Sequence, residues 1–141
     1  MTHVLIREYY ACFNERRFRD AADLFAMDAV LEHPPFGPAT RGGNGYIQFA
    51  EMWTGAFPDG TMTIDHVEQR GDTICEVDLV AAGTHTGDVD TGPYGVFKAT
   101  GARATLRCRE LLEIRADKIT YSSLSFDVHE LIRQLKPLAR F

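Results

Sequence analysis

Hydrophobic residues recur at helical spacing through the first part of the chain. They are Val4, Leu5, Tyr9, Cys12 and Phe13, and the pattern continues at Ala21, Leu24 and Phe25. Steps of three and four residues place such side chains on one face of a helix. The run Asn14-Glu15-Arg16-Arg17 interrupts the pattern with polar residues. The sequence therefore predicts a helical hairpin with one apolar face over residues 2 to about 27.

A short strand and a third helix are expected next. Residues 29–33 read as a strand that Pro34-Pro35 stops, and the following stretch is too rich in proline and glycine to be anything but a loop. Asn44 is a candidate N-cap for the helix after it. Residues 46–56 are apolar nearly all round, which indicates burial on more than one side, and the run from Phe57 to Gly60 ends the helix.

From Thr61 onward the hydrophobic period changes to two, which is typical of strands. Turn signals divide this half at Gly71-Asp72, between Gly87 and Pro93, and at Ala116-Asp117. The expected strands cover residues 61–70, 73–86, 95–114 and 118–126. Consecutive strands of this kind pair antiparallel. The pattern therefore predicts an α+β fold, with the helices packed on one face of a curved antiparallel sheet.

The composition supports one ordinary folded domain spanning residues 1–141. The chain has 141 residues, of which 45% are hydrophobic and 25% charged, and it is too short for two substantial cores. Its net charge of −5 argues against a nucleic-acid partner and against an anionic membrane surface, because both need basic residues. No apolar run approaches the roughly 20 residues of a membrane span, and no secretory signal opens the chain. We expect a cytoplasmic protein.

The three cysteines favour burial over chemistry. Cys12, Cys75 and Cys108 are far apart in the sequence and form no CxxC or Cys/His cluster. A disulfide, a zinc site or a redox centre is therefore poorly supported. We expect small buried hydrophobic side chains.

The longest expected strand places one carboxylate on its apolar face. Between residues 106 and 114 the even positions hold Leu106, Cys108, Glu110, Leu112 and Ile114, whereas charged residues dominate the odd positions. Strand alternation sends the even set inward. Burial would raise the pKa of Glu110 and suit the carboxyl to proton transfer near neutral pH. The alternative is a structural salt bridge.

The neighbouring strands add a cross-strand partner and a histidine. With the turn centred on Ala116-Asp117, Glu110 falls opposite Leu124, and Ser122, Leu124 and Phe126 face inward. On the strand 73–86 the odd positions are apolar, so His85 would also point inward. Glu110 and His85 would then share one interior as catalytic residues. The alternative for His85 is a buried histidine held by backbone groups.

Other residues receive separate interpretations. Asp127, with Glu130 three residues later, has the spacing of a capping box, so we interpret it as a helix cap. Arg107 and Arg109 are expected in solvent or at a subunit contact. The candidate substrate-binding residues are Trp53, His33, Tyr46, Leu112, Leu124 and Phe126. For Trp53 and Tyr46, simple core packing is the alternative.

Several segments together resemble the SnoaL-like polyketide cyclase family of the NTF2-like superfamily. They are Phe57-Pro58-Asp59, Gly71-Asp72, Gly83-Thr84-His85-Thr86-Gly87, Thr100-Gly101, Asp117-Lys118-Ile119, and Asp127 followed by Leu131 to Leu135. The resemblance covers about residues 5 to 135. It implies a cone formed by a strongly bent sheet and three helices around a hydrophobic pocket, a homodimer through the outer sheet face, and no metal or organic cofactor. It also implies ring closure by aldol condensation, with an acidic residue and a histidine as general acid and base.

The sequence departs from the family pattern in its last strand. Family cyclases commonly carry a Trp-Asp pair there, and this chain has Ser123 and Leu124 instead. Glu110, facing Leu124 across the hairpin, is the candidate for a displaced carboxylate.

The leading functional hypothesis is an enzyme that uses Glu110 as a base, assisted by His85, on a small apolar carbonyl compound. Removal of a proton next to the carbonyl would lead to ring closure or isomerisation. The first alternative is a non-catalytic module for ligand binding or dimerisation. The second is epoxide opening by an activated water, which relatives perform with a cluster of Asp and Arg that we do not find facing inward.

Overall fold

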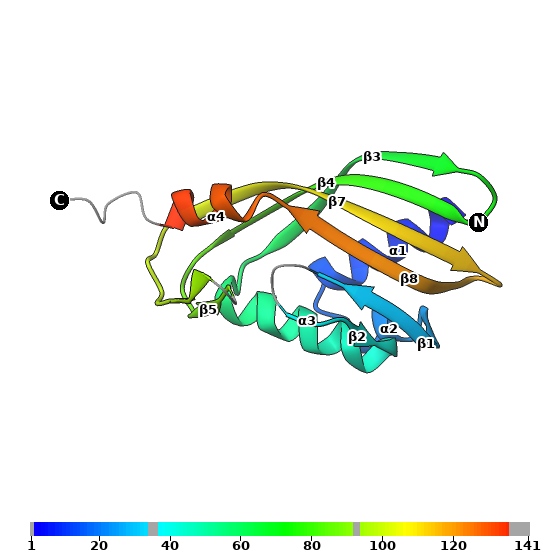
Figure 1. Ribbon diagram of the computed structural model, residues 1–141, viewed down its shortest axis with the longest axis horizontal. Helices are drawn as coiled ribbons and strands as arrows, with labels where there is room; N and C mark the ends of the chain where they lie inside the picture. The colour runs from blue at the N-terminus through cyan, green and yellow to red at the C-terminus, as the bar shows by residue number, and fades with distance from the viewer. Residues whose placement is uncertain (1, 34–36, 92–93, 136–141) are drawn as a thin grey trace.

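Three helices precede and one follows a long run of strands in the computed structural model, which describes residues 2–33, 37–91 and 94–135 (Figure 1). The helices are α1 (Thr2–Asn14), α2 (Phe18–Ala22), α3 (Gly42–Ala56) and α4 (Val128–Leu135). The strands are β1 (Phe25–Glu32), β2 (Thr40–Arg41), β3 (Thr61–Arg70), β4 (Ile74–Thr84), β5 (Val89–Asp90), β6 (Val96–Phe97), β7 (Arg103–Arg115) and β8 (Lys118–Phe126).

The main sheet has six strands in the order β2-β1-β8-β7-β4-β3, and β5 pairs with β6 in a separate two-stranded ribbon. The pairs β3–β4, β4–β7 and β7–β8 are antiparallel, as the sequence predicts. β1, however, runs parallel to β8, so the expectation of a purely antiparallel sheet is wrong. Tight turns impose antiparallel pairing only on strands that are consecutive, and most of the chain separates β1 from β8.

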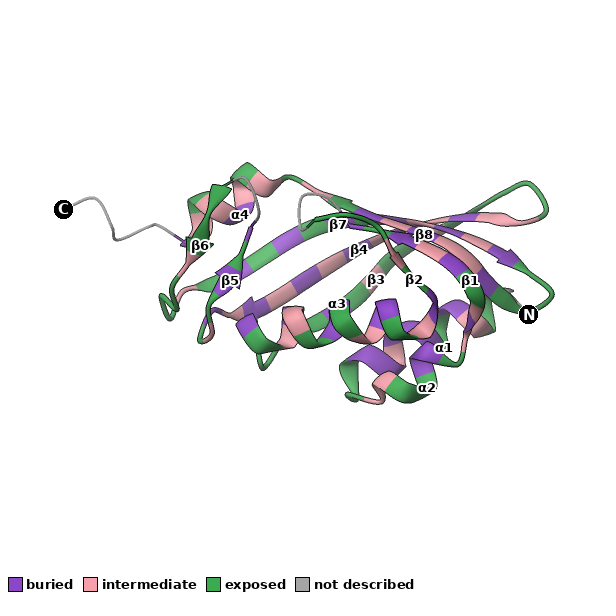
Figure 2. Ribbon diagram, turned by 60° about the horizontal axis from the view of Figure 1, so that its bottom comes forward, coloured by how far each residue is buried: buried purple, intermediate pink, exposed green. Residues whose placement is uncertain are grey.

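Helices α1, α2 and α3 lie on one face of this curved sheet (Figure 1). Buried bands alternate with more exposed ones along β4 and β7 (Figure 2). The inward set predicted for the long strand is confirmed, because Leu106, Cys108, Glu110, Leu112 and Ile114 are all buried. The three cysteines are buried and free, as expected. The α+β class predicted from the sequence is therefore confirmed.

The helical hairpin ends earlier than its hydrophobic pattern suggests. Helix α2 stops at Ala22, and Phe25 already belongs to β1, where it pairs with Ile119 of β8. The Ile119 amide also donates to the Leu24 carbonyl at 2.8 Å. Residues 25–27 are thus strand where helix was predicted. Pairing with a distant strand outweighs the local helical spacing here.

Helix α3 begins two residues before the predicted cap. It starts at Gly42, and Arg41 precedes it without a side-chain cap, so the interpretation of Asn44 as the N-cap is wrong. A Cβ on Gly43 would lie 2.7 Å from the Ala22 carbonyl oxygen. A Cβ on Gly45 would lie 2.7 Å from Oγ1 of Thr40. The glycines therefore let the helix approach α2 and β2 closely. The predicted end holds, since Phe57 is the C-cap. Pro34-Pro35, the predicted stop of the first strand, lie outside the described residues.

The strands β3, β4 and β8 match their predicted ranges closely. The predicted strand 95–114 is instead divided into β6 and β7. Between them Gly101 has a φ of +74° and its amide donates to the His85 carbonyl at 2.7 Å. A residue with this φ does not continue a strand, which explains the break.

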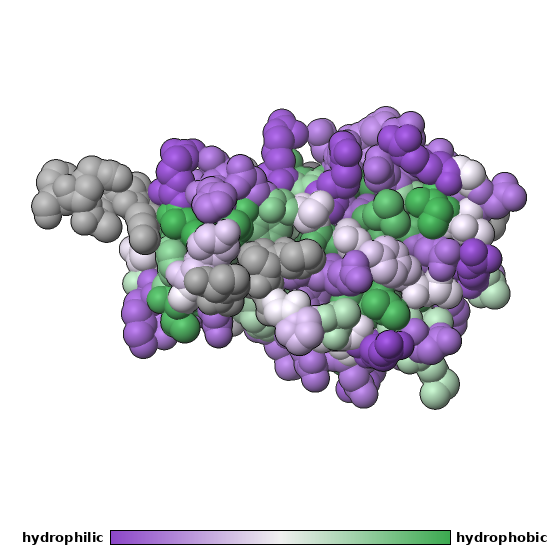
Figure 3. Space-filling model, viewed as in Figure 1, coloured by the Kyte–Doolittle hydropathy of each residue, from purple (hydrophilic) through white to green (hydrophobic). Residues whose placement is uncertain are grey.

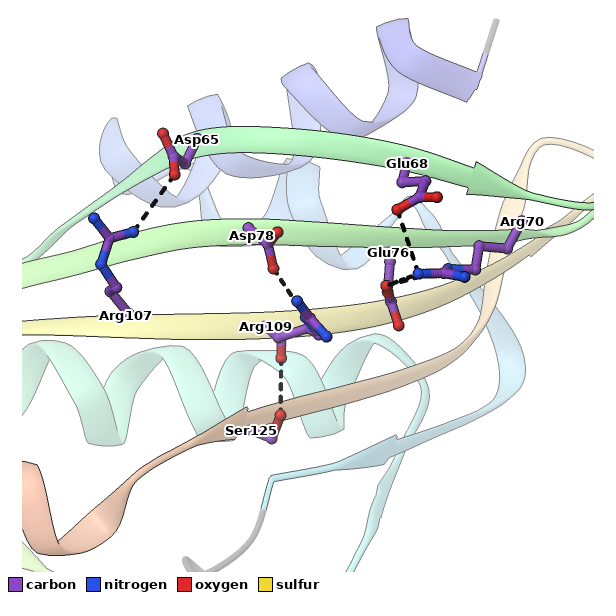
Figure 4. Close-up of polar contacts among 8 residues, drawn as sticks. All are labelled: Asp65, Glu68, Arg70, Glu76, Asp78, Arg107, Arg109 and Ser125. Atoms are coloured by element: carbon purple, nitrogen blue, oxygen red, sulfur yellow. Dashed lines mark hydrogen bonds and ion pairs between the residues drawn. The ribbon is translucent and has the colours of Figure 1, made fainter.

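The outer face of the sheet carries paired charges. Figure 4 shows ion pairs between Arg107 and Asp65 and between Arg109 and Asp78, while Arg70 bridges two carboxylates. Arg107 and Arg109 are exposed, in agreement with the sequence interpretation. Hydrophilic residues cover much of the face seen in Figure 3, and hydrophobic ones show between them as separate patches. None of the helices in the described residues is long and apolar enough to span a membrane.

Candidate active site

A narrow cavity lies on the inner side of the sheet, between its strands and helices α1 and α3. Its volume is about 20 Å³, which is the room that about one water molecule needs. The residues that line it come from the neighbouring strands β1, β8 and β7, from the position directly after β1, from β3, and from helices α1 and α3. They are Tyr9, Tyr10, Phe13, Leu31, Glu32, His33, Tyr46, Phe49, Met62, Glu110, Ser122 and Leu124.

Glu110 lies on β7 and lines this cavity. It pairs with Leu124 of β8 on one side and with Val77 of β4 on the other. The cross-strand partner predicted from the turn position is therefore confirmed. The Glu110 side chain faces inward and the residue is 4% exposed. An acidic residue this deeply buried is rare unless something stabilises it.

Three hydroxyl groups stabilise the Glu110 carboxylate. Oε2 accepts a hydrogen bond from the Tyr9 hydroxyl at 3.0 Å and another from the Ser122 hydroxyl. Oε1 accepts one from the Tyr10 hydroxyl. A carboxylate offers about four acceptor positions. One position on Oε1 thus has no donor among the described residues, and the carboxylate lines the cavity.

Burial and hydrogen bonding act in opposite directions on Glu110. Burial raises the pKa of its carboxyl above the ordinary value, and the hydroxyls of Ser122, Tyr10 and Tyr9 oppose that rise without cancelling it. Within the described chain no cation pairs with Glu110, so the alternative of a structural salt bridge finds no partner there. The site therefore holds a buried carboxylic acid that binds its proton more tightly than an exposed one does.

The two tyrosines stay protonated. Burial first, and the charge of Glu110 second, raise the pKa of Tyr9 and that of Tyr10 well above the ordinary value. Both hydroxyls therefore remain donors over the range in which proteins are stable. Tyr9 donates to Oε2 and Tyr10 to Oε1, so the two hydroxyls together fix the orientation of the carboxylate.

His85 is buried and inward-facing but belongs to a different place. It follows Val77, the β4 partner of Glu110, by eight residues, or at most about 26 Å of extended chain. It is not among the described residues that line the Glu110 cavity. Its Nδ1 accepts from the Thr100 amide at 3.2 Å, and its ring lies 5.5 Å from that of Phe57. The structure does not bring His85 and Glu110 together.

The surroundings of His85 fit the structural alternative. Burial lowers its pKa, while Asp88 and the backbone of Phe97 and Gly87 act in the opposite direction. Through its hydrogen bond with the Thr100 amide, the ring joins the end of β4 to the segment before β7. Nδ1 of His85 thus holds this loop, while its buried Nε2 has no hydrogen-bond partner among the described residues.

The predicted substrate-binding residues divide into two groups. His33, Tyr46 and Leu124 line the cavity. Trp53 instead packs on Phe57, with ring centroids 4.9 Å apart, and also contacts Phe126. Leu112 of β7 is fully buried on the inner face of the sheet. The structure therefore brings half of this set to Glu110 and leaves Trp53, Leu112 and Phe126 outside the described lining.

Sequence reasoning missed the three hydroxyl donors of Glu110. One signal was available in Ser122, which is the polar member of the inward set formed with Leu124 and Phe126. Tyr9 counted only as an apolar residue of its helix. Consecutive tyrosines point about 100° apart on a helix, so no periodic pattern indicates that both hydroxyls reach one carboxylate.

Asp127 caps the last helix, as predicted. Its Oδ1 accepts from the His129 amide at 2.9 Å and from the Glu130 amide at 3.4 Å. The Glu130 side chain does not return to the cap but pairs with Arg133 and Gln134. The first half of the capping box is present and the second is replaced by contacts within the helix.

Solved structures with the same fold include several with cyclase-like descriptions. IdmH of Streptomyces antibioticus, a candidate polyketide cyclase, is 25% identical with a TM-score of 0.78, and the match covers 94% of this chain and 96% of that chain. AclR of Streptomyces galilaeus, a candidate hydroxylase, is 16% identical with a TM-score of 0.79, covering 99% and 83%. A Catenulispora acidiphila protein of ketosteroid isomerase-like fold, bound to trimethylamine, is 16% identical with a TM-score of 0.76, covering 92% and 90%.

Of the two sequence comparisons, the one with family profiles identifies a family. No curated protein matches the chain. The SnoaL-like domain profile matches residues 6–122, a stretch that includes Glu110 and its three hydroxyl donors. Structural relatives of the same shape are described as candidate polyketide cyclases and hydroxylases. This chain belongs to the SnoaL-like domain family of the NTF2-like superfamily.

Proposed function

We propose that the protein is an enzyme that needs no cofactor and uses Glu110 as a general base on a small, largely apolar carbonyl compound. Glu110 removes a proton from the carbon next to the carbonyl, and the resulting enolate closes a ring or isomerises. The observation that carries the proposal is the Glu110 carboxylate itself, which is 4% exposed yet lines a cavity.

The chemistry of the cavity supports this assignment. A general base works best when its pKa lies near the working pH, and burial moves the pKa of Glu110 upward from its ordinary value. Hydroxyls of Tyr9 and Tyr10 hold both carboxylate oxygens in place. The remaining walls are mostly aromatic or aliphatic, which keeps bulk water away from a reactive enolate.

The size of the cavity bears on how a substrate enters. A volume of about 20 Å³ holds about one water molecule, so we expect side chains of the lining to move when an organic carbonyl compound binds. Phe49 and Met62 line the cavity and keep a small exposed fraction. Met62 has the flexible side chain of the two, and methionine adapts to varied shapes.

Two other functions remain as alternatives. A binding or dimerisation module would hold an apolar ligand without turning it over, and exchange of a ligand proton separates this case from catalysis. Epoxide opening by a cluster of Asp and Arg residues receives no support from the described lining, where Glu110 and Glu32 are the acidic residues and no arginine occurs.

The deciding experiment is deuterium exchange at the carbon next to a carbonyl. Cyclopentanone and cyclohexanone in D₂O serve as probes, and ¹H NMR follows the loss of the exchangeable protons with and without protein. The wild-type protein should accelerate exchange of at least one probe. E110Q should abolish the acceleration while the probe still binds, because the amide keeps the shape and loses the base.

A matched carboxylate on the outer face supplies the control. Asp78 pairs with Arg109 in solvent, so D78N should exchange the probe at the wild-type rate. Equal rates for E110Q and the wild-type protein would remove Glu110 from the mechanism. Probe binding to the wild-type protein without any accelerated exchange would instead favour the binding module.

A further inference from the structure

We propose that His33 is the second reactive group of the cavity and that its Nδ1–H donates a hydrogen bond to the carbonyl oxygen of the substrate whose neighbouring proton Glu110 removes. This inference rests on the proposed function and deepens it by assigning the histidine that acts with Glu110. It replaces His85 in that role.

Strand register places His33 across the cavity from Glu110. Leu31 pairs with Ser122 and Glu32 with Ser123. His33 follows directly and continues toward Leu124, which pairs with Glu110. Adjacent strands lie about 4.8 Å apart, so the two backbones are about 10 Å apart over two strand spacings. Both side chains are buried and both line the cavity. A carbonyl group fits between two side chains at this separation.

Donation into the cavity requires the tautomer of His33 with its proton on Nδ1, and the contact with Thr40 is compatible with that tautomer. Oγ1 of Thr40, on the adjacent strand β2, lies 3.5 Å from Nε2. A hydroxyl that donates to Nε2 leaves the ring proton on Nδ1. Phe49 stacks on the same ring, with centroids 5.1 Å apart, and fixes its plane. Burial lowers the pKa of His33, which keeps the imidazole neutral.

Two buried polar atoms of the lining have no hydrogen-bond partner among the described residues. They are Nδ1 of His33 and the hydroxyl of Tyr46. Buried polar groups are nearly always paired, so these atoms call for an oxygen acceptor in the cavity, which a water molecule or a substrate carbonyl can supply. Glu32 accepts a hydrogen bond from Tyr121 and makes none with Nδ1 of His33. Nδ1–H therefore stays available to the substrate.

The reaction step balances without a further reactant. Glu110 takes the proton on the carbon next to the carbonyl, and the electron pair of that C–H bond becomes a C=C bond. The carbonyl π electrons move to the oxygen, where Nδ1–H of His33 stabilises the developing negative charge. Return of a proton, or a deuteron in D₂O, from Glu110 to carbon regenerates the ketone.

The first test compares two substitutions at His33 in the deuterium-exchange assay. H33F keeps a flat ring against Phe49 and removes the donor, so exchange should slow by about 100-fold, as for loss of one oxyanion donor. H33Q keeps a donor and should recover part of the rate. Thermal unfolding of both variants should stay close to that of the wild-type protein. An unchanged rate in H33F would overturn the proposal.

The second test reads the ring directly and does not depend on turnover. In protein labelled with ¹⁵N-histidine, long-range ¹H–¹⁵N spectra should show His33 neutral with the proton on Nδ1. T40V removes the hydroxyl that faces Nε2 and should shift the population toward the Nε2–H form. Cyclopentanone should move the Nδ1 resonance, and cyclopentane should not.

The two proposals fail in different ways. Exchange that survives E110Q contradicts the proposed function, while a ketone-dependent shift of the His33 Nδ1 resonance would still support the hydrogen bond. Exchange that is lost in E110Q and unaffected in H33F contradicts the role of His33 alone. A His33 ring protonated on Nε2 in the wild-type protein would also overturn it.

Discussion

Neighbouring residues of β7 place opposite kinds of charge in opposite surroundings. Arg109 projects from the outer face, where it is exposed and its Nε lies 2.9 Å from Oδ1 of Asp78. Glu110 projects into the interior, where hydroxyl groups surround it and no cation pairs with it in the described residues. One strand thus carries a solvated ion pair and a buried acid with one residue's difference in position.

The contrast shows what a buried ion pair would cost the site. A cation beside Glu110 would hold its proton affinity low, as the pairing with Asp78 holds the guanidinium of Arg109 in its charged form. Neutral hydroxyls stabilise a carboxylate more weakly, so the pKa of Glu110 remains raised. Placing hydroxyls around the acid keeps it able to gain and lose a proton, which a base requires.

The largest effect is expected from a second carboxylate on the inner face. L124D places an acid opposite Glu110, and burying an unpaired charge should lower the free energy of unfolding by about 3–5 kcal/mol. Mild acid should restore part of that loss, because two adjacent carboxylates resist ionisation together. The measurement is urea unfolding at two pH values. S125D, on the exposed side of the same strand, is the matched control and should change stability little. Equal effects would mean that Leu124 is not inward.

The second effect concerns the hydroxyls. Y10F removes a donor to the buried carboxylate and should lower the free energy of unfolding by about 1.5–3 kcal/mol, the worth of a hydrogen bond to a charged group. Because the Tyr10 bond lowers the pKa of Glu110, its loss should raise that pKa further. Thermal unfolding and the pH profile of exchange report the two effects. Y121F removes a similar bond to the exposed Glu32 and should change stability clearly less.

The third effect is a pH dependence of stability. The pKa of Glu110 is raised on folding, so its favourable contribution is complete below the ordinary value of 4.5 and is lost as pH rises through the folded pKa. E110Q lacks this titration, so its stability relative to the wild-type protein should increase as the pH rises above 4.5. Every pH unit between the folded and unfolded pKa values is worth about 1.4 kcal/mol. A constant difference between pH 4 and pH 8 would contradict a raised pKa.

The smallest effect belongs to the outer face. R109A breaks the exposed contact with Asp78, and such surface pairs contribute little because water and salt screen them. Its unfolding midpoint should shift by less than that of any inner-face variant above, and 0.5 M NaCl should reduce the shift further. A change as large as that of Y10F would show that the outer face is covered by another molecule, such as a second copy of this chain.

The sequence predicts the strands well because their alternation reflects the sheet they form. The inward position of Glu110 and its partner Leu124 follow from alternation and from the turn at Ala116-Asp117, both local features. Tyr9 and Tyr10 come from a helix about 100 residues away, and only the packing of α1 on β7 brings them to the carboxylate. The spacing of hydrophobic residues along the chain gives no information about a contact between residues so far apart.

A similar cause explains why the sequence points to His85 and the structure brings His33 to the cavity instead. Alternation gives the face of His85 correctly but not its distance along the strand from Glu110. His33 reaches the cavity because β1 pairs in parallel with β8, a contact between the two ends of the fold. Face follows from neighbouring residues, whereas position along the sheet depends on pairing across the whole chain.

The glycines at the start of α3 make the width of the cavity depend on residues that do not line it. Tyr46 and Phe49 of this helix form one wall of the cavity, and the strands form the opposite wall. A methyl group at Gly43 or Gly45 would lie 2.7 Å from an oxygen of α2 or β2, so the helix would have to shift to admit it. Members of the family with larger residues at these two positions would have a cavity of a different width around the same reactive groups. The width of the cavity can then change during evolution without any change in the residues that line it.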